Sequence, residues 1–154
     1  MSAPASDIVV RPLRPDDMSE MLDMWVAAWQ AAYPAINFAK RRDWAEMHFA
    51  GLERTRSQVR VALLDDEIVG ALAVNPQTGY LDQLVVAVPA QRRGIAATLL
   101  AEARRLSPAL LELHVNQDNA RAIAFYKKNG FAVGGEDVNP RSGAPIYLMR
   151  WEKG

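Results

Sequence analysis

Apolar residues recur at helical spacing in the first third of the chain. Between Met18 and Ala32 they stand three or four residues apart, which gathers them on one face of an amphipathic helix. Asp16 or Asp17 is expected to cap this helix, and Pro34 to follow its end. The pattern therefore predicts a helix whose buried face is broad and rich in aromatic rings.

Two shorter segments flank this helix. A strand is expected over residues 8–14, because the residue before Pro15 is pushed toward extended geometry. A second helix is expected over residues 41–52, with Trp44, Met47 and His48 on one side of it. The sequence suggests no partner for His48, and no spacing of histidines and carboxylates resembles a metal site.

Beyond residue 58 the pattern changes from helical spacing to strands. Residues 59–64 and 68–74 are rich in β-branched side chains and flank the short polar segment 65–67, which predicts a hairpin. After a turn at 75–79, residues 80–88 form a long strand that is too apolar near its end to have a solvent-facing side. This strand is therefore expected at the centre of the sheet.

The second half of the chain alternates strand and helix before a last hairpin. A helix is expected over residues 94–106 and a strand over 110–115, parallel to the central strand if the crossover has the usual right hand. Asn119 is expected to cap a further helix that ends at Asn129 and Gly130. Residues 131–138 and 145–151 predict a closing antiparallel hairpin.

Length and composition narrow the class of protein. The 154 residues predict a single domain over 1–154 with one core. Eighteen basic and 18 acidic residues cancel, so nucleic acid is not an expected partner. No leader-like N-terminus or apolar span is visible, which favours a cytoplasmic protein without a membrane partner. Because cysteine is absent, any acyl transfer must be direct rather than through a protein thioester.

A phosphate-binding loop is the first candidate for chemistry. The segment after the central strand contains one glycine and leads directly into a helix. Helix N-termini carry unpaired N–H groups and partial positive charge, so such a segment can cradle a pyrophosphate. A plain strand-to-helix turn is the alternative reading of the same residues. The candidate cradle comprises Gln91, Arg92, Arg93, Gly94, Ile95, Ala96 and Ala97.

This loop resembles the Gln/Arg-x-x-Gly-x-Gly/Ala signature of the Gcn5-related N-acetyltransferase (GNAT) superfamily. Asn116, Asn119, Ala122, Phe125 and Tyr126 resemble the second cofactor block of that family. The order of elements is similar too. The resemblance implies an α/β (α+β) fold with a mixed sheet of about seven strands, splayed in the middle, and about four helices.

The same resemblance implies that acetyl-CoA is the acyl donor and lies between the two central parallel strands. Its pyrophosphate would rest on the loop amides, and the backbone of Val86, Ala87 and Val88 would hold its arm. A splayed strand suits this role, because its unpaired N–H and C=O groups can bond an amide-bearing ligand. Asn116 and Asn119 resemble positions near that arm, although Asn119 is equally explained as a helix cap.

The resemblance also implies catalytic roles. Tyr126 resembles the tyrosine that stands near the cofactor sulfur, where a phenol can protonate the departing thiolate; plain core packing is the alternative. Two residues could deprotonate the amine, His114 on one strand and Asp82 on the other. Trp29 and Tyr33 stand where the family's first helices form the acceptor wall.

The expected function is acetyl-CoA-dependent transfer of an acetyl group to a primary amine of a small molecule or protein. A non-catalytic acyl-CoA sensor is the alternative, which would need neither Tyr126 nor a titratable base. Zero net charge gives no general attraction for basic tails and so favours a small or neutral acceptor. The edge of the final hairpin offers a surface for a homodimer.

Overall fold

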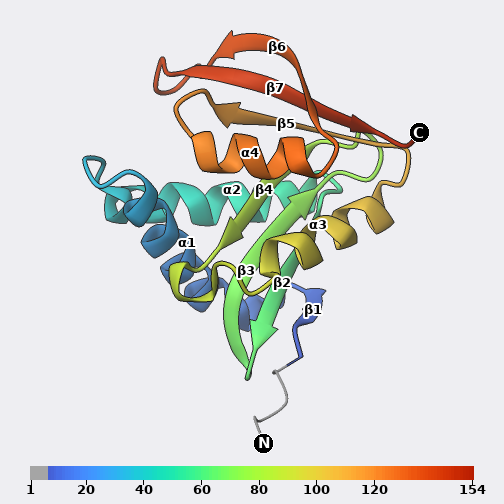
Figure 1. Ribbon diagram of the computed structural model, residues 1–154. Helices are drawn as coiled ribbons and strands as arrows, with labels where there is room; N and C mark the ends of the chain where they lie inside the picture. Colours follow the sequence, from blue (N-terminus) through green and yellow to red (C-terminus); the bar gives the residue numbers. More distant parts are fainter. Residues whose placement is uncertain (1–6) are drawn as a thin grey trace, which may run out of the picture.

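The chain forms seven strands and four α-helices within residues 7–154, the part that this computed structural model describes (Figure 1). In chain order these elements are β1 (Val9–Pro12), α1 (Met18–Ala32), α2 (Arg42–Arg54), β2 (Gln58–Leu64), β3 (Glu67–Val74), β4 (Leu81–Val86), α3 (Ile95–Leu106), β5 (Leu110–Asn116), α4 (Ala120–Lys128), β6 (Ala132–Val138) and β7 (Pro145–Glu152). Short 3-10 turns, η1 (Pro15–Asp17), η2 (Phe38–Arg41) and η3 (Val88–Ala90), precede α1, α2 and the loop to α3.

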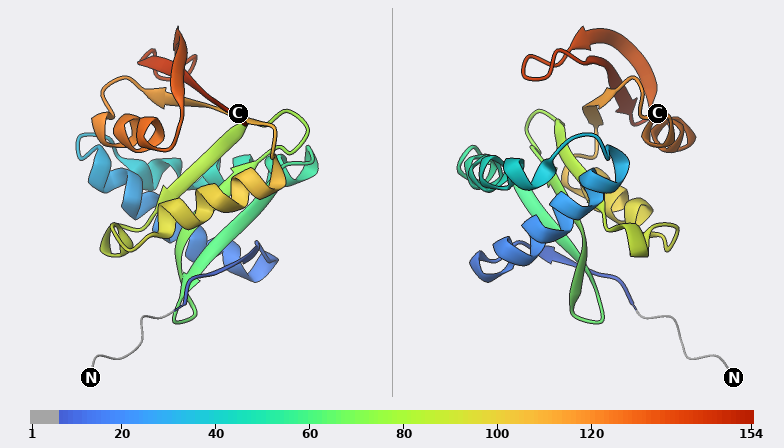
Figure 2. Two further views of the ribbon diagram at one scale, coloured as in Figure 1. Left: turned by 45° about the vertical axis from the view of Figure 1, so that its right-hand side comes forward. Right: turned by 90° about the vertical axis from the view of Figure 1, so that its left-hand side faces the viewer.

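The strands form two sheets that meet at one corner. The first has the order β1-β2-β3-β4 and the second the order β5-β7-β6, with every pairing within them antiparallel. β4 and β5 run parallel and are joined by a bridge between Tyr80 and Glu112. From that corner they diverge into a V (Figures 1 and 2). The expected splayed mixed sheet and parallel crossover are confirmed.

Gly79 makes the corner possible. Its φ is +77°, and a Cβ at this position would lie 2.6 Å from the Leu110 carbonyl oxygen. The Gly79 carbonyl accepts a 2.9 Å hydrogen bond from the Glu112 N–H. Only glycine tolerates both the left-handed backbone and this close approach, so the residue fixes where the V begins.

Helices cover the two faces of the first sheet (Figure 2). α1 and α2 pack on one face around Leu22, Phe49 and Val61, while α3 packs on the other around Leu72 and Leu99. α4 lies on the same side as α3 and covers the second sheet. The buried residues of α2 are Ala45 and Phe49, whereas Met47 is 74% exposed.

Several element ends also differ from the sequence-based expectation. The β2–β3 turn needs only Asp65 and Asp66, both with positive φ, as a two-residue hairpin turn requires. Asp17 gives no side-chain cap to α1, because its carboxylate bonds the Arg14 N–H and the Arg11 guanidinium. β4 ends at Val86 rather than at residue 88, since Val88 begins η3.

Candidate active site

A cleft of about 920 Å³ opens between the arms of the V. α1 forms one wall, the end of β4 the floor, and the starts of α3 and α4 the remaining walls. Residues from these four elements include Trp29, Leu84, Val86, Gly94, Asn119 and Tyr126. The sequence-predicted cofactor residues Val88, Gln91, Arg92, Ile95, Ala96 and Ala97 line it too. This cleft therefore gathers most of the residues expected to contact the donor.

The start of α3 has the geometry of an anion cradle. Arg92 and Gly94 both have positive φ, 69° and 83°, and Gly94 is the N-cap of the helix. Thr98 donates the first hydrogen bond back into the turn, to the Gly94 carbonyl at 3.0 Å. The N–H groups that precede it in the first turn have no intrahelical acceptor. Residues in left-handed conformation beside a helix start form a concave set of donors that suits a phosphate.

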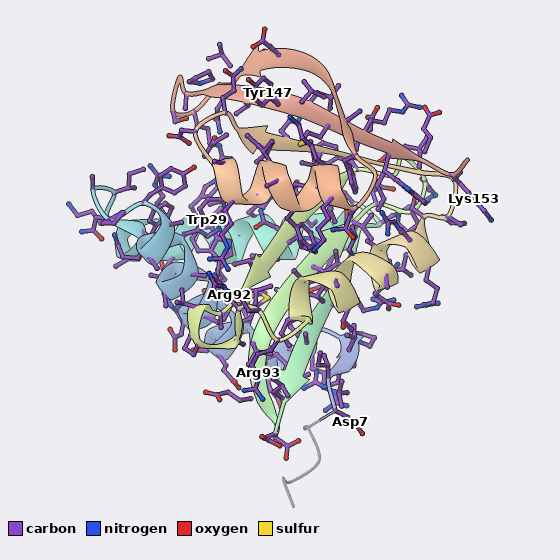
Figure 3. The ribbon with its side chains drawn as sticks, in the orientation of Figure 1. Asp7, Trp29, Arg92, Arg93, Tyr147 and Lys153 are labelled. Carbon is purple, nitrogen blue, oxygen red and sulfur yellow. The ribbon has the colours of Figure 1, made fainter. Side chains whose placement is uncertain are left out.

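Basic side chains add charge to this cradle. Arg92, Arg121 and Lys128 line the cleft against a single acidic residue, Asp118. Arg121 donates a hydrogen bond to the Gln91 side chain and so connects α4 to the loop before α3. The wall residues Trp29 and Arg92 are labelled in Figure 3. An open cleft with an excess of cations fits the phosphates of coenzyme A.

Sequence reasoning missed Arg121. A basic residue two positions after the Asn119 cap was the available signal, but only the folded structure brings it across to Gln91. The Asn119 side chain accepts a 3.2 Å hydrogen bond from the Ala122 N–H, so the expected cap is confirmed.

At the end of β4, some backbone groups face β3 and others face the cleft. Ala87 donates its N–H to the Val69 carbonyl at 2.8 Å, which directs its backbone toward β3 and not toward the cleft. Val86 and Val88 line the cleft, whereas Ala87, Arg93 and Asn116 are not among its lining residues. The backbone that remains on the cleft side is therefore that of Val86, the last residue of β4, and of Val88, the first residue of η3.

Tyr126 stands at the inner wall of the cleft. It is 7% exposed and packs edge-to-face against Phe125 and Phe131. Burial raises the pKa of Tyr126 well above its ordinary value of 10. The phenol thus keeps its proton at neutral pH and can donate it or a hydrogen bond into the cleft.

A β-bulge turns Asp82 away from the cleft. Val74 pairs with Leu81 and Ala73 with Gln83, so no β3 residue stands opposite Asp82. Its Oδ1 atom lies 2.7 Å from Nε2 of His48 on α2. The expectation that His48 has no partner is therefore wrong, and the α2 side of β4 carries a His–Asp pair.

His114 lies on the same side of the V as this pair. Leu113 and Val115 point into the core beneath α4, so the alternating His114 side chain points the other way and is exposed. Its Nδ1 atom lies 2.7 Å from the Tyr80 hydroxyl. Burial, together with the nearby charges of Asp82 and Glu112, raises the pKa of Tyr80 to about 12. The two base candidates thus occur in two separate hydrogen-bonded pairs.

Tyr33 connects the end of α1 to the loop after β5. Its hydroxyl donates to Asp118 at 2.8 Å and accepts from the Asn116 amide at 3.1 Å. Trp29 stacks on Tyr33 at 6.0 Å between ring centroids, and its indole N–H is buried without a partner in the described part of the chain. Trp29 therefore belongs to the cleft, while Tyr33 and Asn116 are not among its lining residues and are connected to it through Asp118.

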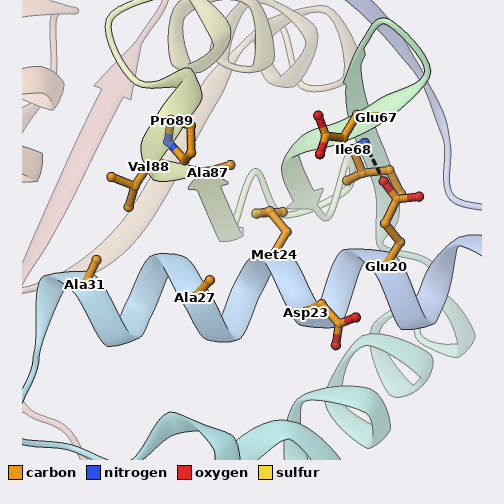
Figure 4. A pocket seen from close by; sticks show the side chains of 10 residues that line it. All are labelled: Glu20, Asp23, Met24, Ala27, Ala31, Glu67, Ile68, Ala87, Val88 and Pro89. Atoms are coloured by element: carbon orange, nitrogen blue, oxygen red, sulfur yellow. Dashed lines mark hydrogen bonds between the residues drawn. The ribbon is translucent and has the colours of Figure 1, made fainter.

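A second cavity of about 470 Å³ adjoins the cleft and shares Ala31 and Val88 with it. Figure 4 shows Glu20, Asp23 and Glu67 around an otherwise apolar wall that includes Met24 and Pro89. Glu20 already accepts a 2.8 Å hydrogen bond from the Ile68 N–H. Its carboxylate therefore has a structural role at the start of β3.

Within residues 7–154 no helix is long and apolar enough to cross a bilayer. Nor do three or more histidine or acidic side chains gather there as a metal site would require.

Comparisons with known proteins identify the family and the fold. The model of the acetyltransferase (GNAT) family matches residues 18–131. The peptidyl-lysine N-acetyltransferase YjaB of Salmonella typhimurium is 28% identical over 143 residues, which cover 92% of this chain and 95% of the relative. The peptidyl-lysine N-acetyltransferase YiaC of Escherichia coli is 24% identical over 143 residues, covering 93% and 96%.

Solved structures share the fold. The PaiA N-acetyltransferase of Thermoplasma acidophilum, in complex with coenzyme A, superposes with a TM-score of 0.80 at 19% identity, over 96% of this chain and 99% of that one. The apo form of YjaB from Escherichia coli gives 0.74 at 24% identity, over 94% and 97%. Because the family model spans most of the chain, this protein belongs to the acetyltransferase (GNAT) family and is an N-acetyltransferase that takes its acetyl group from acetyl-CoA.

Proposed function

We propose that this enzyme acetylates the side-chain amine of lysine in proteins. The observation that carries the proposal is the polar side of the V, which faces away from the cleft and carries Asp82. Asp82 bonds His48, and within residues 7–154 its carboxylate is paired with no lysine or arginine. Its negative charge is therefore available to an incoming ammonium group. The zero net charge of the whole chain favours a small or neutral acceptor, but it does not describe the local charge on this side of the V.

Two further observations support a protein acceptor. The polar side is an open strand face on which His114 is exposed, so a side chain carried by a larger molecule can reach it. The relatives YjaB and YiaC, which span nearly all of this chain, are named peptidyl-lysine N-acetyltransferases.

Within this proposal Asp82 accepts a proton from the acceptor ammonium, directly or through a water, because an ammonium has no lone pair with which to attack. His114 is the alternative proton acceptor. The bound donor supplies an activated acetyl carbonyl and a thiolate leaving group. The new N–C bond replaces the C–S bond, and Tyr126 gives its hydroxyl proton to the departing sulfur. The second amine proton restores Tyr126, and the first leaves from Asp82 to solvent.

The test is an acetylation assay with the full chain, acetyl-CoA and a lysine peptide whose N-terminus is blocked. We expect free thiol to appear in step with a gain of one acetyl group on the peptide, and neither change with the lysine-to-alanine peptide. A parallel panel of diamines and polyamines tests the small-molecule alternative. Turnover of that panel but not of the peptide would overturn the protein-lysine proposal. Comparing Asp82→Asn with His114→Gln separates the two base candidates.

A further inference from the structure

His48 has a defined geometry that the roles described above leave unused. Its Nε2 atom lies 2.7 Å from Asp82 Oδ1, and the two side chains are 25% and 21% exposed. A carboxylate oxygen accepts hydrogen bonds. In the tautomer that makes this contact, His48 Nε2 carries the proton and donates to Asp82 Oδ1.

Two side chains contact the Asp82 carboxylate, both at the same oxygen. The Gln83 amide also donates to Oδ1, at 3.1 Å, beside the His48 contact. Within residues 7–154 no donor bonds Oδ2. Two donors on one oxygen fix the plane of the carboxylate and leave the other oxygen for an acceptor amine.

The His48 ring is itself held by aromatic contacts. It stacks on Trp44 with 4.7 Å between centroids and an interplanar angle of 16°, and it meets Phe49 edge-on at 6.4 Å. The Arg141 guanidinium, from the β6–β7 turn, lies 3.9 Å from the centre of the Trp44 ring. These contacts form a continuous chain from Arg141 through Trp44 and His48 to Asp82.

We propose that His48 is a positioning residue, which holds the bulged Asp82 carboxylate with Oδ2 directed at the acceptor amine. The proposal rests on the proposed role of Asp82 as proton acceptor. A carboxylate at a bulge lacks the restraint of a regular strand, so a rigid donor from α2 replaces it. His48 thereby acts on the acceptor step and not on binding of the donor.

A double-mutant cycle tests this with the full chain and the acetylation assay. We expect Asp82→Asn to lower kcat by about 100-fold and His48→Ala to lower it by about tenfold, since misplacing a reacting group costs rate. His48→Gln should restore kcat to within about threefold of the native value, because its amide nitrogen can reach Oδ1 as Nε2 does. KM for acetyl-CoA should stay constant throughout. The matched control is Met47→Ala, an exposed neighbour on α2.

The decisive measurement is His48→Ala in the Asp82→Asn background. If His48 acts through Asp82, the double variant is no slower than Asp82→Asn alone. An equal loss in both backgrounds, or no loss in the single variant, would overturn the positioning role. Circular dichroism and thermal unfolding of each variant separate misfolding from this result. Absence of acetyl transfer by the native chain to any amine would instead refute the proposed function.

Discussion

Tyr126 shows how one residue can serve both the core and the chemistry. Its ring packs between Phe125 and Phe131, while its side chain lines the cleft. Removing the hydroxyl preserves the ring contacts, so Tyr126→Phe isolates the proposed proton transfer. We expect kcat to fall by about 100-fold, the scale of a lost general acid, with the Kd for acetyl-CoA unchanged. Thiol release and a binding titration measure the two quantities, and an undiminished kcat would remove the proposed role.

Single residues also mark the limit of sequence reasoning. The Asn119 cap and the Gly130 turn, with φ of +92°, could be predicted because their chemistry is local. The His48–Asp82 contact could not, because it joins residues 34 positions apart and depends on a bulge that breaks the alternation of β4. Strict alternation would place Asp82 with Leu84 on the cleft side.

At the scale of elements, the loop into α3 requires a left-handed backbone conformation. Gly94 has φ of +83°, and an added Cβ would meet nothing within 4 Å. Gly94→Ala therefore adds no clash to the free protein and costs only the left-handed conformation, about 1 kcal/mol. If the backbone leaves the left-handed conformation to avoid that cost, the first amides of the helix rotate out of the cradle.

We expect Gly94→Ala to weaken acetyl-CoA binding by about tenfold or more while lowering the free energy of unfolding only slightly. Isothermal titration and urea unfolding provide the two measurements. Gly143→Ala is a matched control, since Gly143 also has positive φ (+73°) and open space, but lies in the distant β6–β7 turn. Equal affinity losses in both variants would show that the cradle geometry is not what binds the donor.

Element order and type were predictable because each element has a strong local pattern. The ends of β4 were not, because strand length there depends on tertiary contacts. Ala87 makes the last hydrogen bond to β3, through Val69, and the chain then enters η3 at Val88. The apolar run from Val85 to Val88 continues past this point, so hydropathy alone overestimates the strand.

The position of β7 between β5 and β6 was also beyond the sequence pattern. The closing hairpin was predicted from its turn, but nothing local says which of its two strands pairs with β5. In the structure β5 pairs with β7 over seven residues, from Leu110 opposite Glu152 to Asn116 opposite Ile146. β6 therefore remains the exposed edge of the sheet. That edge is where the predicted homodimer contact would form.

At the scale of the molecule, backbone hydrogen bonds join the two sheets only near Tyr80 and Glu112, within the part of the chain described. Side-chain contacts across the V, such as Tyr33 to Asp118 and Arg121 to Gln91, supply the other connections. A donor bound in the cleft would contact the end of β4 in the first sheet and α4, which packs on the second sheet. Binding should therefore stabilise the whole fold and not only the loop it touches.

Thermal unfolding of the full chain with increasing acetyl-CoA measures this coupling. At about 100 times the Kd, ligand binding should add about 2.7 kcal/mol to the free energy of unfolding, which raises Tm by several degrees. Adenosine diphosphate, which can reach the α3 cradle but has no arm to span the V, should give a much smaller shift at the same concentration. Hydrogen exchange should slow in both β4 and β5 with acetyl-CoA and near α3 alone with the diphosphate. Equal shifts from the two ligands would mean that the cradle holds the nucleotide while the arms of the V contribute nothing to donor binding.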